Sequence, residues 1–246
     1  MGTRRTRIRA GRICTDFFWK LRLETYEKIK KRPNPRSHSL YTIHKISKMD
    51  LFSMLEGGKT NPIEGLTYIP AFITVEEQQN LLESIDKNEW LNDLKRRVQH
   101  YGYKYNYRKR NIDLSMKIGA LPNWAIQIGQ KLLAQDLIKQ EPDQLIINEY
   151  LPGQGIANHI DCEPCFEDGI ASISLGSACC IEFTNGHNRS EIIPILLEPR
   201  SAIVMKGIAR YDWQHGIKAV KMDIWQGQKI IRARRVSLTF RKVILN

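Results

Sequence analysis

The sequence predicts a mainly β protein with flanking helices, an α+β fold built on an antiparallel sandwich or a jelly roll. After Pro142 the chain breaks into short segments rich in β-branched and aromatic residues, separated by Gly, Pro and Asn. Segments of this length and spacing are typical of antiparallel sandwiches and jelly rolls. The six expected strands cover residues 145–150, 170–175, 178–184, 191–197, 201–205 and 234–243.

Two amphipathic helices are expected ahead of these strands. Thr74 and Glu77 have the Thr-x-x-Glu spacing of a capping box, and apolar residues follow at helical intervals, which predicts a helix over residues 75–87. A second helix is expected to start near Pro122, because Pro suits a first turn and the apolar residues that follow fall on one side. We expect both helices to cover one face of the sheet.

The composition describes a globular chain whose positive charge is concentrated at one end. The 246 residues are 42% hydrophobic and 26% charged, and the formal net charge is +12. Residues 1–48 hold 14 Lys and Arg against three Asp and Glu, so +11 of that charge lies there. We therefore divide the chain into a basic N-terminal arm, residues 1–62, and one domain, residues 63–246. The arm has three open explanations: a solvated or spurious extension upstream of Met49, a targeting segment, or a nucleic-acid contact.

The cysteines and the apolar runs bear on the cellular setting. Five cysteines are an odd number, and Cys179 and Cys180 are adjacent, so we expect a reducing compartment and no disulfide framework. Cys162-Glu-Pro-Cys165 offers half of a zinc site, but without a second pair we interpret both residues as free thiols. No apolar run approaches the ~18 residues that cross a bilayer. We expect a monomeric, intracellular and cytoplasmic protein without membrane contact, or a nuclear or organellar one if the arm is a targeting signal.

The most specific chemical motif is His159-Ile-Asp161, with His215 further along the chain. Side chains alternate in an extended segment, so His159 and Asp161 point to the same side and can bind one ion. Two imidazoles and one carboxylate bind Fe(II) on one face and leave positions open for a cosubstrate and O₂. Taken alone, a His-x-Asp pair fits a polar loop better than a metal site, so the surrounding motifs decide.

The last expected strand carries two arginines on one face. Four polar residues alternate with apolar ones there: Arg235, Ser237, Thr239 and Arg241. Buried arginines need anionic partners, and guanidinium groups pair bidentately with carboxylates, so this face suits a small dicarboxylate. An edge strand with solvated arginines is the alternative.

Asn148 and Tyr150 have the same two-residue spacing, where an amide and a phenol can each donate a hydrogen bond to a carboxylate or keto group. Together with the motifs above, this pattern resembles the AlkB family of Fe(II)/2-oxoglutarate dioxygenases over residues 64–246. The matching motifs are Asn148-Glu-Tyr150-Leu-Pro-Gly153, His159-Ile-Asp161, Ile173-Ser-Leu-Gly176, Arg210-Tyr-Asp-Trp213-Gln-His215-Gly216-Ile217 and Arg235-Val-Ser-Leu-Thr-Phe-Arg241. Residues 142–148 and 166–169 look more like the AlkB homologues associated with tRNA wobble uridines.

The resemblance implies a double-stranded β-helix (jelly roll) core and a role for each motif. The iron ligands would be His159, Asp161 and His215, and the residues around the cosubstrate 2-oxoglutarate would be Asn148, Tyr150, Arg235, Ser237 and Arg241. Arg235 would pair with the distal carboxylate of 2-oxoglutarate, and O₂ would take the remaining iron position. Two residues depart from the pattern. Ser237 stands where many members have Asn. Glu163 stands where the bacterial repair enzyme has an Asp near the damaged base, so the substrate of that enzyme is not a safe guide to the substrate of this chain.

Residues 95–117 are expected to contact the substrate. They contain eight Lys and Arg against one acid, and four tyrosines alternate between positions 101 and 107, so their rings would share one face of an extended segment. Aromatic rings can stack bases while cations neutralise phosphates, and the resemblance places the substrate lid here. A hairpin with tyrosines packed on the barrel and solvated charges is the alternative. The expected substrate-binding residues are Tyr101, Tyr103, Arg108, Glu163 and Arg210.

These expectations combine into one function with two rivals. The chain would oxidise an alkyl group on DNA or RNA and release succinate and CO₂. The reaction would be demethylation of N-methylated bases, as in DNA repair, or hydroxylation of a modified tRNA uridine. The rivals are a dioxygenase that acts on protein and a non-catalytic, metal-binding, cupin-like module.

Overall fold

The computed structural model describes residues 63–245, apart from residues 93–94 and 106–110. The expectations for the arm, residues 1–62, lie outside the described residues, and they stay predictions together with the domain boundary. No helix in the described part is long and apolar enough to cross a membrane.

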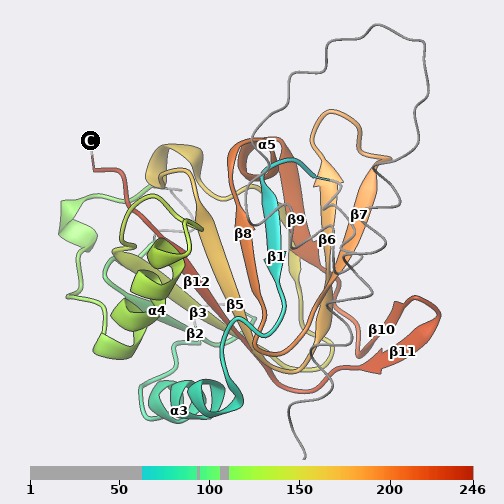
Figure 1. Ribbon diagram of the computed structural model, residues 1–246, viewed down its shortest axis with the longest axis horizontal. Coiled ribbons are helices and arrows are strands. Elements are labelled where there is room, and N and C mark those ends of the chain that lie inside the picture. The colour runs from blue at the N-terminus through green and yellow to red at the C-terminus, as the bar shows by residue number, and fades with distance from the viewer. Residues whose placement is uncertain (1–62, 93–94, 106–110, 246) are drawn as a thin grey trace, which may run out of the picture. The chain divides into compact units, whose positions relative to one another are not determined.

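Two antiparallel sheets form the framework, and this is the jelly-roll core that the sequence predicts (Figure 1). The larger sheet has the order β1 (Leu66–Ile69), β8 (Ala202–Met205), β5 (Ile170–Gly176), β12 (Arg235–Arg241), β3 (Gln144–Tyr150) and β2 (Val98–Tyr101). The smaller sheet has the order β4 (Ile156–His159), β9 (Trp213–Ile217), β6 (Cys179–Asn185) and β7 (Ile192–Leu197). A separate hairpin pairs β10 (Met222–Trp225) with β11 (Gln228–Ile231).

Two helices cover one face of the larger sheet, as expected. They are α3 (Val75–Asp86) and α4 (Asn123–Ala134), and Figure 1 shows both on the side away from β6 and β7. The predicted capping box is confirmed, because the Thr74 hydroxyl accepts from the Glu77 N–H at 3.0 Å and the Glu77 carboxylate accepts from the Thr74 N–H at 2.7 Å. Buried Leu81, Ile85 and Leu132 then pack into the main core.

Strand alternation gives the larger sheet two chemically different faces. On β12, Val236, Leu238 and Phe240 are at most 1% exposed and pack in the core under the helices. Leu145 and Ile147 of β3 join the same core. The intervening residues of both strands face the smaller sheet, where a cavity opens. This face is where the chemistry is found.

The six predicted strands are confirmed as β3, β5, β6, β7, β8 and β12, with ends shifted by at most two residues. The other six strands are not predicted, because β1, β2, β4, β10 and β11 have four residues each and β9 has five. Over so few residues, periodicity does not distinguish a strand from a loop. The equally short β8 is predicted because all four of its residues are apolar, whereas each of these six strands includes polar residues. The shorter elements are α5 (Gly207–Tyr211) and the 3₁₀ turns η1 (Leu114–Met116) and η2 (Glu163–Cys165).

The interpretation of Cys162 and Cys165 as free thiols is wrong. The structure joins them in a disulfide, with Cα atoms 5.3 Å apart. The 3₁₀ turn η2 is the physical reason, because it folds the chain back over the two residues that separate the cysteines. Both are buried in a small cluster with Phe166 and Val243, next to the cavity.

Candidate active site

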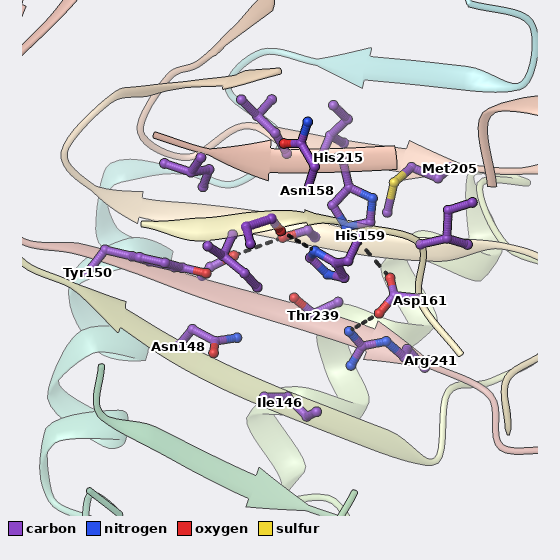
Figure 2. A pocket seen from close by; sticks show the side chains of 18 of the residues that line it. Ile146, Asn148, Tyr150, Asn158, His159, Asp161, Met205, His215, Thr239 and Arg241 are labelled. Atoms are coloured by element: carbon purple, nitrogen blue, oxygen red, sulfur yellow. Dashed lines mark hydrogen bonds and ion pairs between the residues drawn. The ribbon is translucent and has the colours of Figure 1, made fainter. Parts of the chain in front are cut away.

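A cavity of about 400 Å³ opens between the two sheets, and it collects most of the residues expected to carry out chemistry. Its walls include β3 and β12 of the larger sheet and β4 and β9 of the smaller one. The predicted site residues that line it are Asn148, Tyr150, His159, Asp161, His215, Arg235, Ser237 and Arg241. Figure 2 shows the two imidazoles and Asp161 on one side, with Asn148 and Tyr150 on the strand across from them.

The two histidines and Asp161 meet because β4 pairs with β9. His159 ends β4 and is in register with His215, and the ring centroids are 4.4 Å apart. Asp161 Oδ2 lies 3.8 Å from His215 Nε2. His159 Nδ1 lies 2.9 Å from the Ala157 carbonyl oxygen, which can only accept, so Nδ1 is the protonated nitrogen and Nε2 is the one that offers a lone pair in the neutral ring.

The charges in this group are set by burial and by Arg241, whose Nη2 donates to Asp161 Oδ1 at 2.7 Å. Burial alone would raise the pKa of Asp161, but the charge of Arg241, followed by those of the two histidines, outweighs it and holds that pKa well below its usual range. Burial, together with His159, lowers the pKa of His215 to about 3, despite the nearby Asp161. An ionised carboxylate beside a neutral imidazole is the state in which such groups bind a metal ion.

The donor set fits a divalent metal ion. Asp161 Oδ2 is buried and has no hydrogen-bond partner among the described residues, which is costly for a carboxylate oxygen unless a cation binds it. Two imidazoles and a carboxylate are typical Fe(II) ligands. In the part of the chain that the structure describes, no three His, Cys, Asp or Glu side chains already have the spacing of a metal centre. Asp161 is paired with Arg241. A bound ion would therefore have to bring the side chains of His159, Asp161 and His215 closer together.

Arg235 lines the cavity from the other end of β12 and is buried there. It is 3% exposed, and its Nη2 donates to Ser174 Oγ at 2.8 Å and to Ser237 Oγ at 3.3 Å. Its Nε and Nη1 are buried and find no acceptor among the described residues. Because a buried cation with unsatisfied donors is unfavourable, this end of the cavity suits a carboxylate.

Two guanidinium groups lie close to the Tyr150 ring. Arg235 is 5.4 Å and Arg96 is 5.5 Å from the centre of its ring. Burial raises the pKa of Tyr150, so it stays a protonated phenol that can donate a hydrogen bond. Arg96 also donates from Nε to Asn148 Oδ1 at 2.8 Å. Sequence reasoning does not single out Arg96, because only its membership of the basic segment 95–117 marks it.

On the opposite face of β3, the buried carboxylate of Glu149 connects β3 to the segments that carry Arg97 and Arg234. Glu149 is 2% exposed, accepts from Arg97 at 2.6 and 2.7 Å, and accepts from Arg234 at 2.6 Å. Arg234 also donates to Asp86 of α3 at 2.8 Å. The hydrogen bond from Arg97 is the largest cause that holds the pKa of Glu149 below its usual value. This network fixes the two segments that carry the neighbouring cavity arginines.

The three tyrosines of this segment that the structure describes do not share one face, which corrects that expectation, and Tyr107 lies outside the described residues. Tyr101 ends β2 and packs edge-on against Trp124 of α4, with ring centroids 5.8 Å apart. Gly102 follows with φ of +77°, a left-handed conformation that turns the chain and breaks the alternation. Tyr103 is then buried at 5% exposure against the disulfide cluster. Neither Tyr101 nor Tyr103 lines the cavity, whereas Tyr105 does.

The remaining substrate-binding expectations fall outside the cavity or outside the described residues. Glu163 is exposed on η2 and does not line the cavity. Arg210 is 2% exposed and donates to the carbonyl oxygens of Asp161 and Cys162 at 3.0 and 3.2 Å, so it supports the loop that carries Asp161. Arg108 lies outside the described residues.

Comparisons with known proteins find similarity to oxygenases. The family model of the 2OG-Fe(II) oxygenase superfamily matches residues 88–241. The tRNA (carboxymethyluridine(34)-5-O)-methyltransferase alkbh8 of Xenopus tropicalis is 38% identical over 200 residues, which are 73% of this chain and 32% of that protein. Uncharacterized protein L905 of Acanthamoeba polyphaga mimivirus is 36% identical over 182 residues, 74% of this chain and 86% of that protein.

Two further comparisons concern a plant relative and the fold. The alkylated DNA repair protein ALKBH8 homolog of Arabidopsis thaliana is 37% identical over 203 residues, 74% of this chain and 59% of that protein. The chain therefore spans about a third of the length of the frog relative and less than two thirds of the plant relative. The solved structure of OsALKBH1 matches 75% of this chain and 99% of its own with a TM-score of 0.57 at 17% identity, which shows a shared fold.

Proposed function

The chain belongs to the AlkB family of 2OG-Fe(II) oxygenases, which are 2-oxoglutarate-dependent dioxygenases, and from this premise we propose that it oxidises an alkyl group on a nucleic-acid base. In this proposal His159, Asp161 and His215 hold Fe(II), and Arg235 holds 2-oxoglutarate. One observation carries it. A single cavity contains both an unsatisfied carboxylate oxygen beside two imidazoles and a buried guanidinium with unsatisfied donors.

The residues of the chain bind and orient in this mechanism. Bound iron, 2-oxoglutarate and O₂ supply the oxidant that hydroxylates a C–H bond, with succinate and CO₂ as by-products. Arg235, supported by Ser174 and Ser237, orients the distal carboxylate, and the protonated phenol of Tyr150 donates to the same ligand. Arg241 keeps Asp161 ionised, which preserves its charge for the metal.

The fate of the product depends on which carbon is hydroxylated. On an N-methyl group the hydroxymethyl product loses formaldehyde and frees the base, whereas on a methylene of a uridine side chain the alcohol persists. The names of the relatives support both substrates, since the frog protein is named for a tRNA carboxymethyluridine and the plant protein for alkylated DNA. Nucleic acid is therefore the proposed substrate class, with an N-methylated base or a side-chain-modified uridine as the target.

The test measures succinate and oxidised product together. The full-length protein is loaded with Fe(II) and 2-oxoglutarate and given oligonucleotides that carry N-methylated bases or modified uridines. His159→Ala should abolish succinate formation and leave the melting temperature of the metal-free protein unchanged. His187→Ala is the matched control and should keep activity, because its side chain is 82% exposed on the surface.

Three results would contradict parts of the proposal. Succinate formation by His159→Ala after chelator treatment would rule out the metal ligands. Oxidation of peptides but of no oligonucleotide would make the protein a dioxygenase of protein substrates. Binding of metal and 2-oxoglutarate without any succinate would identify a non-catalytic module.

A further inference from the structure

Arg96 is a cation of the cavity that the proposed function leaves without a partner of opposite charge. Its Nε donates to Asn148, and its guanidinium lies over the Tyr150 ring, but both partners are neutral. Within the described part of the chain it forms no ion pair, and its two Nη groups donate to no acceptor. Arg96 is only partly buried, so these Nη groups can meet a ligand that enters the cavity.

The balance of charge around the cavity makes this cation significant. Among the described lining residues, the Asp, Glu, Lys and Arg side chains are Arg96, Asp161, Arg235 and Arg241. Arg241 pairs with Asp161 at 2.7 Å. Arg235 has the unsatisfied donors that one carboxylate of the cosubstrate would fill, and Fe(II) together with dianionic 2-oxoglutarate adds no net charge, so the loaded cavity keeps a net positive charge. The positive charge of Arg96 therefore remains available for the molecule that binds next.

The backbone that carries Arg96 is held in place by contacts of the adjacent residue on the face of β3 away from the cavity. The adjacent Arg97 donates twice to buried Glu149, and the Glu149 N–H donates to the Arg97 carbonyl oxygen at 3.0 Å. The Arg97 guanidinium also lies 5.0 Å from the centre of the Trp90 ring. A side chain on a fixed backbone loses less conformational freedom when it binds, so Arg96 is preorganised for a ligand.

We propose that Arg96 binds an anionic group of the substrate and that this contact selects substrates which carry one close to the oxidised carbon. The inference rests on the proposed function. A guanidinium binds two oxygens of a carboxylate or a phosphate through parallel N–H donors, and this geometry gives specificity as well as affinity. The anion is a carboxylate on the modified base or the phosphate of the same nucleotide, which present the same pair of oxygens.

The test uses probes that differ only in charge. Two oligoribonucleotides of one sequence carry 5-carboxymethyluridine or its methyl ester, which share the same methylene group. The two corresponding nucleosides lack phosphate. Dissociation constants are measured for the full-length enzyme with Fe(II) and 2-oxoglutarate under anaerobic conditions, so that no turnover occurs. O₂ is then admitted, and the hydroxylated product is quantified.

Two patterns support the proposal and identify the anion. For a carboxylate, the wild type binds the acid about 10-fold or more tightly than the ester in both formats, and Arg96→Gln loses this preference. For a phosphate, Arg96→Gln weakens both oligonucleotides by about 10-fold and leaves the nucleosides unchanged. Arg96→Lys should retain part of the effect, and Arg189→Gln, at an exposed position, should change nothing.

Three results would overturn the proposal about Arg96. The proposal is overturned if Arg96→Gln binds every probe like the wild type, if the wild type binds none of them, or if the substitution raises only the KM for 2-oxoglutarate. Charge-dependent binding that requires Arg96 but yields no product would support the Arg96 proposal and contradict the proposed function.

Discussion

Replacing Arg235 by Met should separate its role in cosubstrate binding from any role in stability. Met keeps much of the aliphatic volume and removes the guanidinium. In the wild type this group is 3% exposed, and two of its nitrogens have no acceptor among the described residues. The protein without cosubstrate therefore carries the cost of a buried, unpaired cation. We expect the melting temperature of unliganded Arg235→Met to equal or exceed that of the wild type.

Cosubstrate binding should respond in the opposite direction. Removing one partner of a buried charged pair costs about 3–5 kcal/mol. Because about 1.4 kcal/mol corresponds to a tenfold change in affinity, the KM for 2-oxoglutarate should rise by about two to three and a half orders of magnitude. The variant would thus be as stable as the wild type and nearly unable to use 2-oxoglutarate at ordinary concentrations.

Succinate formation as a function of 2-oxoglutarate concentration measures the KM, and thermal denaturation measures the melting temperature. Arg234→Met is the matched control, because Arg234 precedes Arg235 and pairs with Glu149 and Asp86 on the opposite face. It should lower the melting temperature and leave the KM unchanged. If Arg235→Met is destabilised and keeps the wild-type KM, Arg235 is structural and the assignment fails.

Two further predictions concern the surroundings of the site. Glu149→Gln should lower the free energy of unfolding at neutral pH by about 1–3 kcal/mol, because two arginines lose their charged partner. Since those arginines hold the pKa of Glu149 below its usual 4.5, this stabilisation is present above that pH and is lost as the pH falls through the lowered pKa. Denaturation curves across this range should therefore converge with those of the wild type, and a constant difference would contradict the argument. A shortened chain that begins at Met49 should fold and decarboxylate 2-oxoglutarate at near full-length rates, and an insoluble product would contradict the domain boundary. If the arm contacts phosphates, the shortening should also flatten the salt dependence of nucleic-acid binding.

Alternation along single strands explains which part of the site could be predicted. Asn148 and Tyr150 share a face of β3, and Arg235 and Arg241 share a face of β12, whatever each strand pairs with. Local sequence is therefore enough to place these residues on one side. The meeting of His215 with the His159 motif depends on the pairing of β9 with β4, which no local pattern reveals. That step needed the resemblance to a known family.

The parts that sequence could not provide depend on contacts between distant segments. At Gly102 a Cβ atom would lie 1.8 Å from the Asp143 carbonyl oxygen, so the chain can turn there only with glycine. The alternation of the tyrosines ends at this point, and neither strand pattern nor propensity shows it. Arg96 enters the cavity because β2 pairs with β3 with Val98 opposite Asn148. This register is a property of the sheet and is not visible in segment 95–117 by itself.

The same two strands carry both the site and the contacts that hold it in place. On β3, Asn148 and Tyr150 face the cavity, and Glu149 between them binds arginines on the other side. Arg235 on β12 faces the cavity in register with Tyr150. A slip of one residue would exchange each cavity residue with its neighbour, so it would bring apolar Val236 into the cavity and the Arg235 charge into the core. Burial of the core thus enforces the register that the chemistry requires, and a variant that weakens the Glu149 contacts should disturb cosubstrate binding only when it also disturbs this register.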